Sequence, residues 1–121
     1  MSQSRGDSMY DKTQLMRGSL EGCILKIIEQ QTTYGYEILM NMREAGWMDV
    51  TEGTLYPILL RLEKLQYIRA EKRDSPFGPK RKYYQITKEG AAYLQEFYEQ
   101  WLKLAETIER LFEGGVKHDE G

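Results

Sequence analysis

Hydrophobic residues recur along the first half of this chain at helical spacing. In the first stretch they stand three or four positions apart, which predicts a helix over residues 12–30 with one buried face. A second stripe predicts a helix over residues 34–44, after a break at Thr32 and Thr33 and before the stop signal Gly46. The two stripes consist of Met16, Leu20, Cys23, Ile24, Ile27 and Ile28, and of Ile38, Leu39 and Met42.

A third helix is predicted from a leucine-rich stripe that ends at Leu65. Thr51 is suited to the N-cap and Glu52 to the positive end of the helix dipole. If the helix starts there, Pro57 lies in its second turn and removes a hydrogen bond; if Thr54 is the cap, Pro57 costs little. We favour the earlier start, with a distorted beginning. The stripe consists of Leu55, Ile58, Leu59, Leu62 and Leu65.

A hairpin and a long helix follow. Residues 67–72 and 82–86 alternate, with Ile68 and Ala70 on one face and Tyr84 and Ile86 pointing inward. Residues 74–79 hold two prolines and a glycine, which predict a protruding loop rather than a tight two-residue turn. Thr87 then caps a helix that reaches Phe112.

This order predicts a mostly α fold with a small β-hairpin, a winged helix-turn-helix domain with a long C-terminal dimerisation helix. We expect a flexible N-terminal arm over residues 1–11, the DNA-binding domain over 12–86, the dimerisation helix over 87–113 and a flexible tail over 114–121.

Composition narrows the class of protein. With 121 residues the chain suits one domain, and a mean hydropathy of -0.65 is that of a soluble protein. No apolar run approaches the ~20 residues that cross a bilayer, and residues 1–11 do not read as a signal peptide. A single cysteine fits a reducing compartment, so we expect a cytoplasmic protein.

The charge is distributed unevenly. The formal net charge is -2, yet residues 61–88 carry nine Lys and Arg against three Asp and Glu. The segments on both sides are acidic. A basic segment between acidic ones is typical of a one-sided electrostatic surface for nucleic acid.

The third predicted helix carries polar groups opposite its leucines. Gly53 has no side chain, so the helix backbone can approach a DNA phosphate closely. The neighbouring hydroxyl groups can donate hydrogen bonds, and the cations attract phosphate. This combination suits a helix that lies in a DNA major groove. The plainer alternative is a solvated helix face; Leu60, also outward, would touch a thymine methyl or pack on the hairpin. The candidates are Gly53, Thr54, Tyr56, Arg61 and Lys64.

Five cations flank the predicted loop of the hairpin. Cations on a projecting loop attract phosphates or a minor groove. The alternative is that these cations protect the edge of the sheet against aggregation. Since Asp74 is the one acidic residue beside them, five cations are more than such protection requires. They are Lys72, Arg73, Lys80, Arg81 and Lys82.

The last helix has an apolar seam at heptad spacing, which predicts a homodimer because the core offers it few partners. It is short for a free coiled coil, so we expect packing onto the partner's first helix. In that helix, Gly18, Ser19 and Gly22 indicate the approach of another helix or a flat ligand; the alternative is that they are tolerated imperfections of the helix. The seam consists of Leu94, Phe97, Trp101, Leu104, Ile108 and Leu111.

No catalytic or metal-binding constellation emerges. Cys23 lies in an apolar stripe, and the one histidine, His118, lies in the predicted tail. No Cys/His cluster has zinc spacing and no glycine loop could cradle phosphate. We therefore expect a non-enzymatic protein without cofactor or metal.

Several segments together resemble the PadR-type transcriptional regulators, over about residues 15–112. The resemblance implies a homodimer that binds a palindromic DNA operator and usually represses, in the short branch of the family. The matching segments are Tyr34-Gly35-Tyr36-Glu37-Ile38, Glu52-Gly53-Thr54-Leu55-Tyr56-Pro57, Arg61-Leu62-Glu63-Lys64, Lys80-Arg81-Lys82-Tyr83-Tyr84 and Ile86-Thr87-Lys88-Glu89-Gly90.

The resemblance also implies particular sites. Its DNA-contact candidates are Thr54, Tyr56, Arg61, Lys80, Arg81 and Lys82. Some short relatives bind flat aromatic drugs against a tryptophan of the last helix, where this chain has Trp101, so a planar aromatic effector is a further expectation. The pocket would be lined by Leu15, Gly18, Ser19, Gly22 and Trp101.

One alternative of another class remains. A winged-helix module could capture another protein through its apolar long helix, with the basic hairpin incidental.

Overall fold

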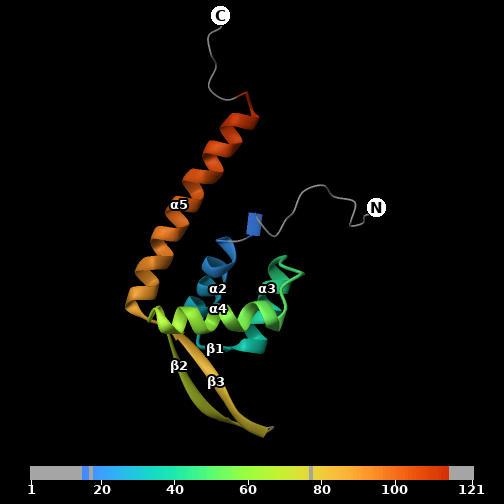
Figure 1. Ribbon diagram of the computed structural model, residues 1–121, viewed down its shortest axis with the longest axis vertical. Helices are drawn as coiled ribbons and strands as arrows, with labels where there is room; N and C mark the ends of the chain where they lie inside the picture. The colour runs from blue at the N-terminus through green and yellow to red at the C-terminus, as the bar shows by residue number, and fades with distance from the viewer. Residues whose placement is uncertain (1–14, 17, 77, 115–121) are drawn as a thin grey trace, which may run out of the picture.

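The computed structural model describes residues 15, 16, 18–76 and 78–114. The predicted order of helices and hairpin is confirmed (Figure 1). The predicted N-terminal arm lies outside the described residues, as does the predicted tail beyond Gly114. The elements are α2 (Ser19–Gln30), β1 (Thr33–Tyr34), α3 (Gly35–Ala45), α4 (Glu52–Lys64), β2 (Ile68–Ser75), β3 (Gly78–Ile86) and α5 (Lys88–Phe112).

The core lies between α2, α3, α4 and the base of the hairpin. The predicted stripes supply most of it, because one face of each helix turns inward. Leu65 is an exception: it follows the last residue of α4 and is 44% exposed, so its predicted burial is wrong. The buried apolar residues are Leu20, Ile24, Leu25, Ile28, Ile38, Leu39, Met42, Val50, Leu55, Leu59, Leu62, Ile68, Tyr84 and Leu94.

The first helix begins later than its stripe predicts. Residues 15 and 16 are helical, but Gly18 has φ +85°, in the left-handed region, and α2 starts only at Ser19. Glycine adopts that conformation without the steric cost that a Cβ would add. Gly18 is therefore a break before the helix and not a small residue within it.

For α4, the earlier of the two predicted starts is correct. Thr51 occupies the N-cap and its carbonyl accepts from the amides of Thr54 and Leu55, at 3.1 and 2.9 Å. Its hydroxyl makes no capping bond and instead lies 3.5 Å from that of Thr54. Pro57 is inside the helix, where it cannot donate the usual bond to the carbonyl of Gly53.

The sheet has three antiparallel strands in the order β1-β3-β2. Helix periodicity did not reveal β1, which pairs Thr33 with Tyr84 and Tyr34 with Tyr83. We call the hairpin β2–β3 the wing. The predicted protruding loop is wrong, because pairing continues to Ser75 opposite Gly78 and only two residues connect the strands.

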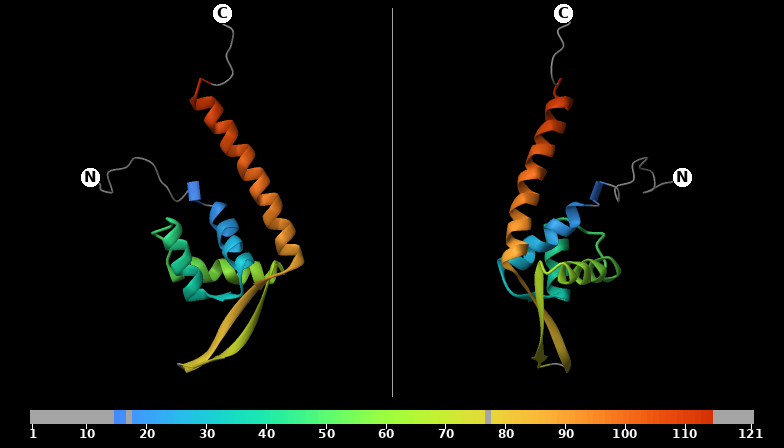
Figure 2. Two further views of the ribbon diagram at one scale, coloured as in Figure 1. Left: turned by 180° about the vertical axis from the view of Figure 1, so that it is seen from behind. Right: turned by 60° about the vertical axis from the view of Figure 1, so that its left-hand side comes forward.

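Helix α5 is attached to the domain at its first turns. Thr87 caps it by accepting from the Gly90 amide at 2.9 Å. A Cβ at Gly90 would lie 2.0 Å from the carbonyl oxygen of Tyr67, so glycine permits this approach. Beyond this junction α5 extends away from the domain, opposite to the wing, and its last turns stand clear of the other elements in all three views (Figure 2).

Candidate nucleic-acid interface

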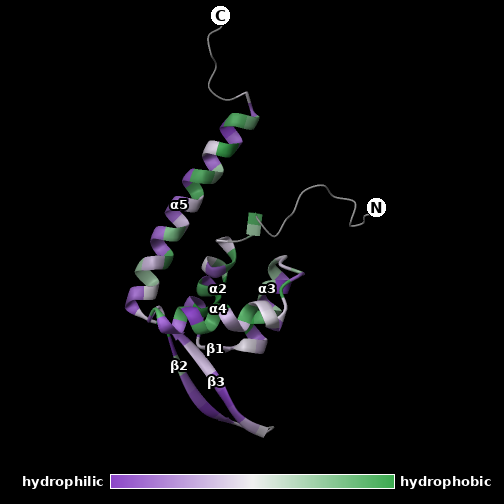
Figure 3. Cartoon of the chain, in the orientation of Figure 1, coloured by the Kyte–Doolittle hydropathy of each residue, from purple (hydrophilic) through white to green (hydrophobic). Residues whose placement is uncertain are grey.

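The cations of the wing are divided between its two faces. Lys72 pairs with Lys82 and Arg73 with Arg81 across the hairpin. Because side chains alternate along a strand, we define a lysine face (Lys72, Lys80 and Lys82, on the side of Ala70 and Tyr84) and an arginine face (Arg69, Arg73 and Arg81, on the side of Tyr83). Both strands are strongly hydrophilic over this stretch (Figure 3).

The lysine face is joined to α4. The ammonium of Lys82 donates to Glu63 at 3.0 Å, with 37% and 34% of the two side chains exposed. Tyr84 beneath them is buried, and this burial, followed by the charges of Glu63 and Tyr56, raises its pKa to about 12. Lys82 thus links the lysine face of the wing to α4.

All five residues predicted on the outer side of α4 are exposed, but they differ in their contacts. Gly53, Thr54 and Lys64 are exposed. Tyr56 is 41% exposed, and its hydroxyl lies so close to α3 that a Cβ at Gly35 would be 2.1 Å away. Glycine at position 35 therefore lets α4 approach the start of α3. Leu60 also faces outward and is 63% exposed.

Arg61 differs from these residues in having an acidic partner. It forms an ion pair with Glu21 of α2, whose other carboxylate oxygen accepts from the Tyr93 hydroxyl at 3.2 Å. At 100° per residue, Arg61 is about 140° around α4 from Tyr56 but only about 20° from Thr54, so it lies beside Thr54 on the exposed side of the helix. Its charge is thus offset by an acid of α2, which its place in the sequence did not indicate.

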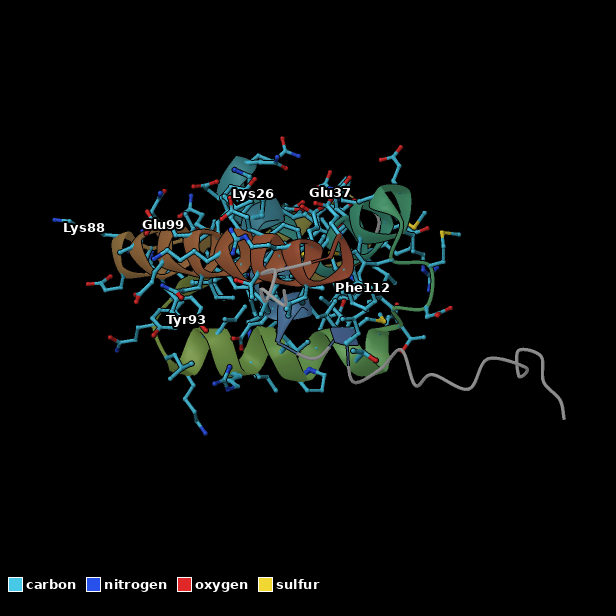
Figure 4. The ribbon with its side chains drawn as sticks, turned by 90° about the horizontal axis from the view of Figure 1, so that it is seen from above. Lys26, Glu37, Lys88, Tyr93, Glu99 and Phe112 are labelled. Atoms are coloured by element: carbon cyan, nitrogen blue, oxygen red, sulfur yellow. The ribbon has the colours of Figure 1, made fainter. Side chains whose placement is uncertain are left out.

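Tyr93 connects these helices to the hairpin. Viewed from above, it lies between α5 and α4 (Figure 4), and its ring stacks on that of Tyr67 with centroids 4.4 Å apart. Burial, and after it the charge and hydrogen bond of Glu21, raises its pKa. Tyr93 thus joins the base of α5 to α2 and to the segment between α4 and the wing.

The predicted seam of α5 divides into a part that packs on the domain and a part that is exposed. Leu94 is buried in its own subunit's core, and Phe97 packs over Gly22, where a Cβ would be 2.2 Å from its ring. Their prediction as exposed seam residues is therefore corrected, because α5 closes the core over its first turns. The remaining seam residues are exposed: Trp101, Leu104, Ile108 and Leu111, at 43, 59, 44 and 63%.

An apolar groove of about 480 Å³ lies between the start of α2 and α5. It brings together Leu15, Ser19 and Trp101 of the predicted pocket. Gly18 and Gly22 do not line it, because Gly18 forms the break before α2 and Gly22 is covered by Phe97. Its lining residues are Leu15, Met16, Ser19, Cys23, Trp47, Phe97, Tyr98 and Trp101.

Two lining residues of this groove differ in how far the sequence predicted them: the position of Trp47 was missed, whereas the apolar stripe already placed Cys23 as a buried thiol. Trp47 follows the stop signal Gly46, and no periodic stripe includes it. A tryptophan outside every stripe was the one feature of the sequence that could have indicated its place in the groove. The pKa of the Cys23 thiol is raised, because burial outweighs a hydrogen bond with Trp47. A thiol so disposed is a poor nucleophile at neutral pH.

A family model, the PadR-like family of transcriptional regulators, matches residues 24–96 of this sequence. The chain belongs to this family. The match spans α3, α4 and the wing entirely and includes the first turns of α5. PadR-type regulators bind DNA and typically dimerise, so this PadR-like protein is a DNA-binding transcriptional regulator.

Two solved structures and one further sequence are similar to most of this chain. A PadR-like transcriptional regulator from Bacillus cereus strain ATCC 14579 is 44% identical, with a TM-score of 0.76 over 84% of this chain and 98% of that one. A Streptococcus transcriptional regulator is 46% identical, with a TM-score of 0.74 over 81% and 96%. An uncharacterised protein from Lysinibacillus sphaericus is 39% identical over 85% of this chain and 96% of its own. The predicted winged helix with a long C-terminal helix is confirmed.

Other kinds of site find no support in the described part of this PadR-like chain. Its His, Cys, Asp and Glu residues form no group of three that could hold a metal ion. Over the same residues, no helix has the length and apolar character that spanning a membrane requires.

Proposed function

We propose that this PadR-like regulator represses transcription as a homodimer bound to a palindromic DNA operator. The observation that carries the proposal is the Lys82–Glu63 bridge, which presents the wing and α4 as one surface. A helix that enters a major groove beside a cationic hairpin accounts for both parts of this surface.

Within this surface the two elements have different roles. The first turns of α4 approach base edges through Gly53, Thr54 and Tyr56. Cations contact phosphates, which supplies affinity without sequence information. Arg61 contributes least, because Glu21 already offsets its charge. The phosphate contacts are Lys64, Lys72, Arg73, Lys80, Arg81 and Lys82.

The distal half of α5, residues 98–112, forms the dimer interface. A contiguous row of exposed large apolar side chains is uncommon on a monomer's surface. The residues that pack onto the first helix of the partner are Trp101, Leu104, Ile108 and Leu111. Two-fold symmetry repeats this contact, so that the partner's α5 packs onto the first helix of this subunit in the same way. Such a dimer presents two wings to two half-sites about one helical turn apart.

A small planar aromatic effector occupies the groove and releases the operator. The volume of about 480 Å³ lies within the range of small-molecule sites, which are mostly apolar. Trp47 and Trp101 offer aromatic faces for stacking. An effector held between α2 and α5 changes the angle at which α5 leaves the domain, and with it the spacing of the two wings.

Charge reversal at the wing tests the DNA-binding surface. Lys80→Glu with Arg81→Glu is compared with Lys26→Glu with Lys88→Glu, the same charge change on α2 and at the first residue of α5. Fluorescence anisotropy follows a labelled duplex from the promoter of the protein's own gene, and sedimentation equilibrium follows the dimer. Since charged hydrogen bonds contribute about 1.5–3 kcal/mol each, the wing variant loses at least ~100-fold in affinity and stays dimeric.

Two outcomes contradict the proposal. Normal DNA binding by the wing variant, or an equal loss in the control variant, excludes the wing as the contact surface. If the unmodified protein binds no duplex at micromolar concentration in low salt, a winged-helix module that captures proteins becomes the better account.

A further inference from the structure

The arginine face of the wing holds a cluster of two arginines and two tyrosines. Arg73 lies 5.0 Å from the ring centre of Tyr83, which meets the ring of Tyr34 edge-on at 5.4 Å. Arg81 lies 4.2 Å from the ring centre of Tyr34. The short strand β1 makes this cluster possible, because it places Tyr34 beside Tyr83 on β3.

The surroundings of Arg81 differ from those of its neighbour Lys82 and its cross-strand partner Arg73. Lys82 shares its charge with Glu63 at 3.0 Å, and Arg73 lies 3.5 Å from a carboxylate oxygen of Glu71. Among the described residues, Arg81 has no acidic side chain within ion-pair distance. A ring and not a carboxylate therefore holds its guanidinium.

This difference matters for the binding of an anion. A carboxylate that holds a guanidinium occupies its N–H donors and offsets its charge, whereas an aromatic face uses neither. An arginine that is free in solution also loses side-chain entropy when it binds. Stacking on Tyr34 removes part of this loss beforehand, while the N–H edge of Arg81 stays available to oxygen acceptors.

We propose that Tyr34 is a positioning residue for DNA binding: its ring holds the guanidinium of Arg81 on the arginine face, ready for a phosphate of the DNA backbone. Tyr34 needs no contact with DNA for this role. The inference rests on the proposed function, in which Arg81 contacts phosphate, and it assigns a purpose to the strand β1 that joins α3 to the wing.

A double-mutant cycle tests the inference. Tyr34→Phe keeps the ring, and Tyr34→Ile removes it but suits a strand, since β-branched residues favour β structure. Both are measured by anisotropy on the duplex from the gene's own promoter, alone and combined with Arg81→Ala, over a series of salt concentrations. Thermal unfolding of each variant reports whether the fold is kept.

The expected pattern is specific. Arg81→Ala lowers affinity and reduces the salt slope by about one for each phosphate that the protein no longer neutralises. Tyr34→Phe stays within about twofold of the unmodified protein, and Tyr34→Ile weakens binding by about two- to fivefold, equivalent to about 0.5–1 kcal/mol for a partly exposed cation–π contact. On the Arg81→Ala background, Tyr34→Ile has no further effect.

The failures are distinguishable. If Arg81→Ala leaves affinity and salt slope unchanged, the proposed function is wrong about Arg81. If Arg81→Ala weakens binding but Tyr34→Ile does not, or weakens it equally on both backgrounds, the inference about Tyr34 is overturned. Should Tyr34→Ile not fold, Arg81→Lys replaces it: the charge stays, the planar stack is removed, and unchanged affinity overturns the inference.

Discussion

Adding one methyl group at Gly22 tests how α5 is attached to the domain. Gly22 is buried in α2, and Phe97 of α5 packs over it. A Cβ there would lie 2.2, 2.4 and 2.5 Å from three carbons of the Phe97 ring. Carbon atoms in contact stand about 3.5–4.0 Å apart, so the ring must move by more than an ångström.

The magnitude follows from two opposing effects. Alanine is favoured over glycine inside a helix by about 1 kcal/mol. Forcing extra volume into a packed site costs about 1–3 kcal/mol. Gly22→Ala therefore lowers the free energy of unfolding by up to about 2 kcal/mol, and each 1 kcal/mol corresponds to about 4–8 °C in Tm for a domain of this size.

A second glycine provides the matched control. Gly53 also lies in a helix, but a Cβ there would meet only the Thr51 hydroxyl, at 3.7 Å. Gly53→Ala should leave Tm unchanged or raise it. In the Gly22→Ala chain, Phe97→Leu should recover stability, giving a coupling of at least ~0.5 kcal/mol between the two sites. A higher Tm for Gly22→Ala, or purely additive effects, refutes this packing.

Three further expectations concern other parts of the molecule. Trp101→Arg with Ile108→Glu should give a monomer by sedimentation equilibrium with the domain's unfolding unchanged; a persistent dimer contradicts the interface. Tyr84 has a pKa near 12 against an ordinary 10, so the stability it contributes is full below pH 10 and is lost as pH rises to about 12. Denaturant unfolding between pH 10 and 12 should show a smaller loss of unfolding free energy for Tyr84→Phe than for the unmodified protein. Equal losses in the two proteins contradict this role of Tyr84. Because burial raises the pKa of Cys23, iodoacetamide should alkylate it more slowly at neutral pH than a cysteine peptide, and equal rates contradict that burial.

Periodicity predicted the helices because each buries one face. The stripe that contains Ile24 and Ile28, and the leucines of α4, are buried as their spacing requires. The two-residue strand β1 could not be predicted in this way, because its pairing with β3 depends on a contact between segments far apart in sequence. The tight turn at Ser75 and Gly78 was missed because local turn residues do not reveal how far strand pairing continues.

The sequence predicted which residues belong to the candidate site better than it predicted how they are arranged. Their positive charge beside the predicted loop identified Lys80, Arg81 and Lys82. Their division between two faces could be seen only from the register of the hairpin. Arg61 resembled its neighbours on a helical wheel, yet Glu21, 40 residues away, pairs with it. Leu94 fits a heptad seam as well as Ile108 does, and only the approach of α5 to its own core separates the two.

The central claim is that a dimer presents two copies of the surface formed by the wing and α4 to one DNA duplex. Hydroxyl-radical footprinting on the promoter of the protein's own gene tests this claim most directly. The account predicts two protected segments about one helical turn apart, on one face of the duplex and related by a palindrome. Protection of a single segment, or uniform protection without sequence preference, would contradict it.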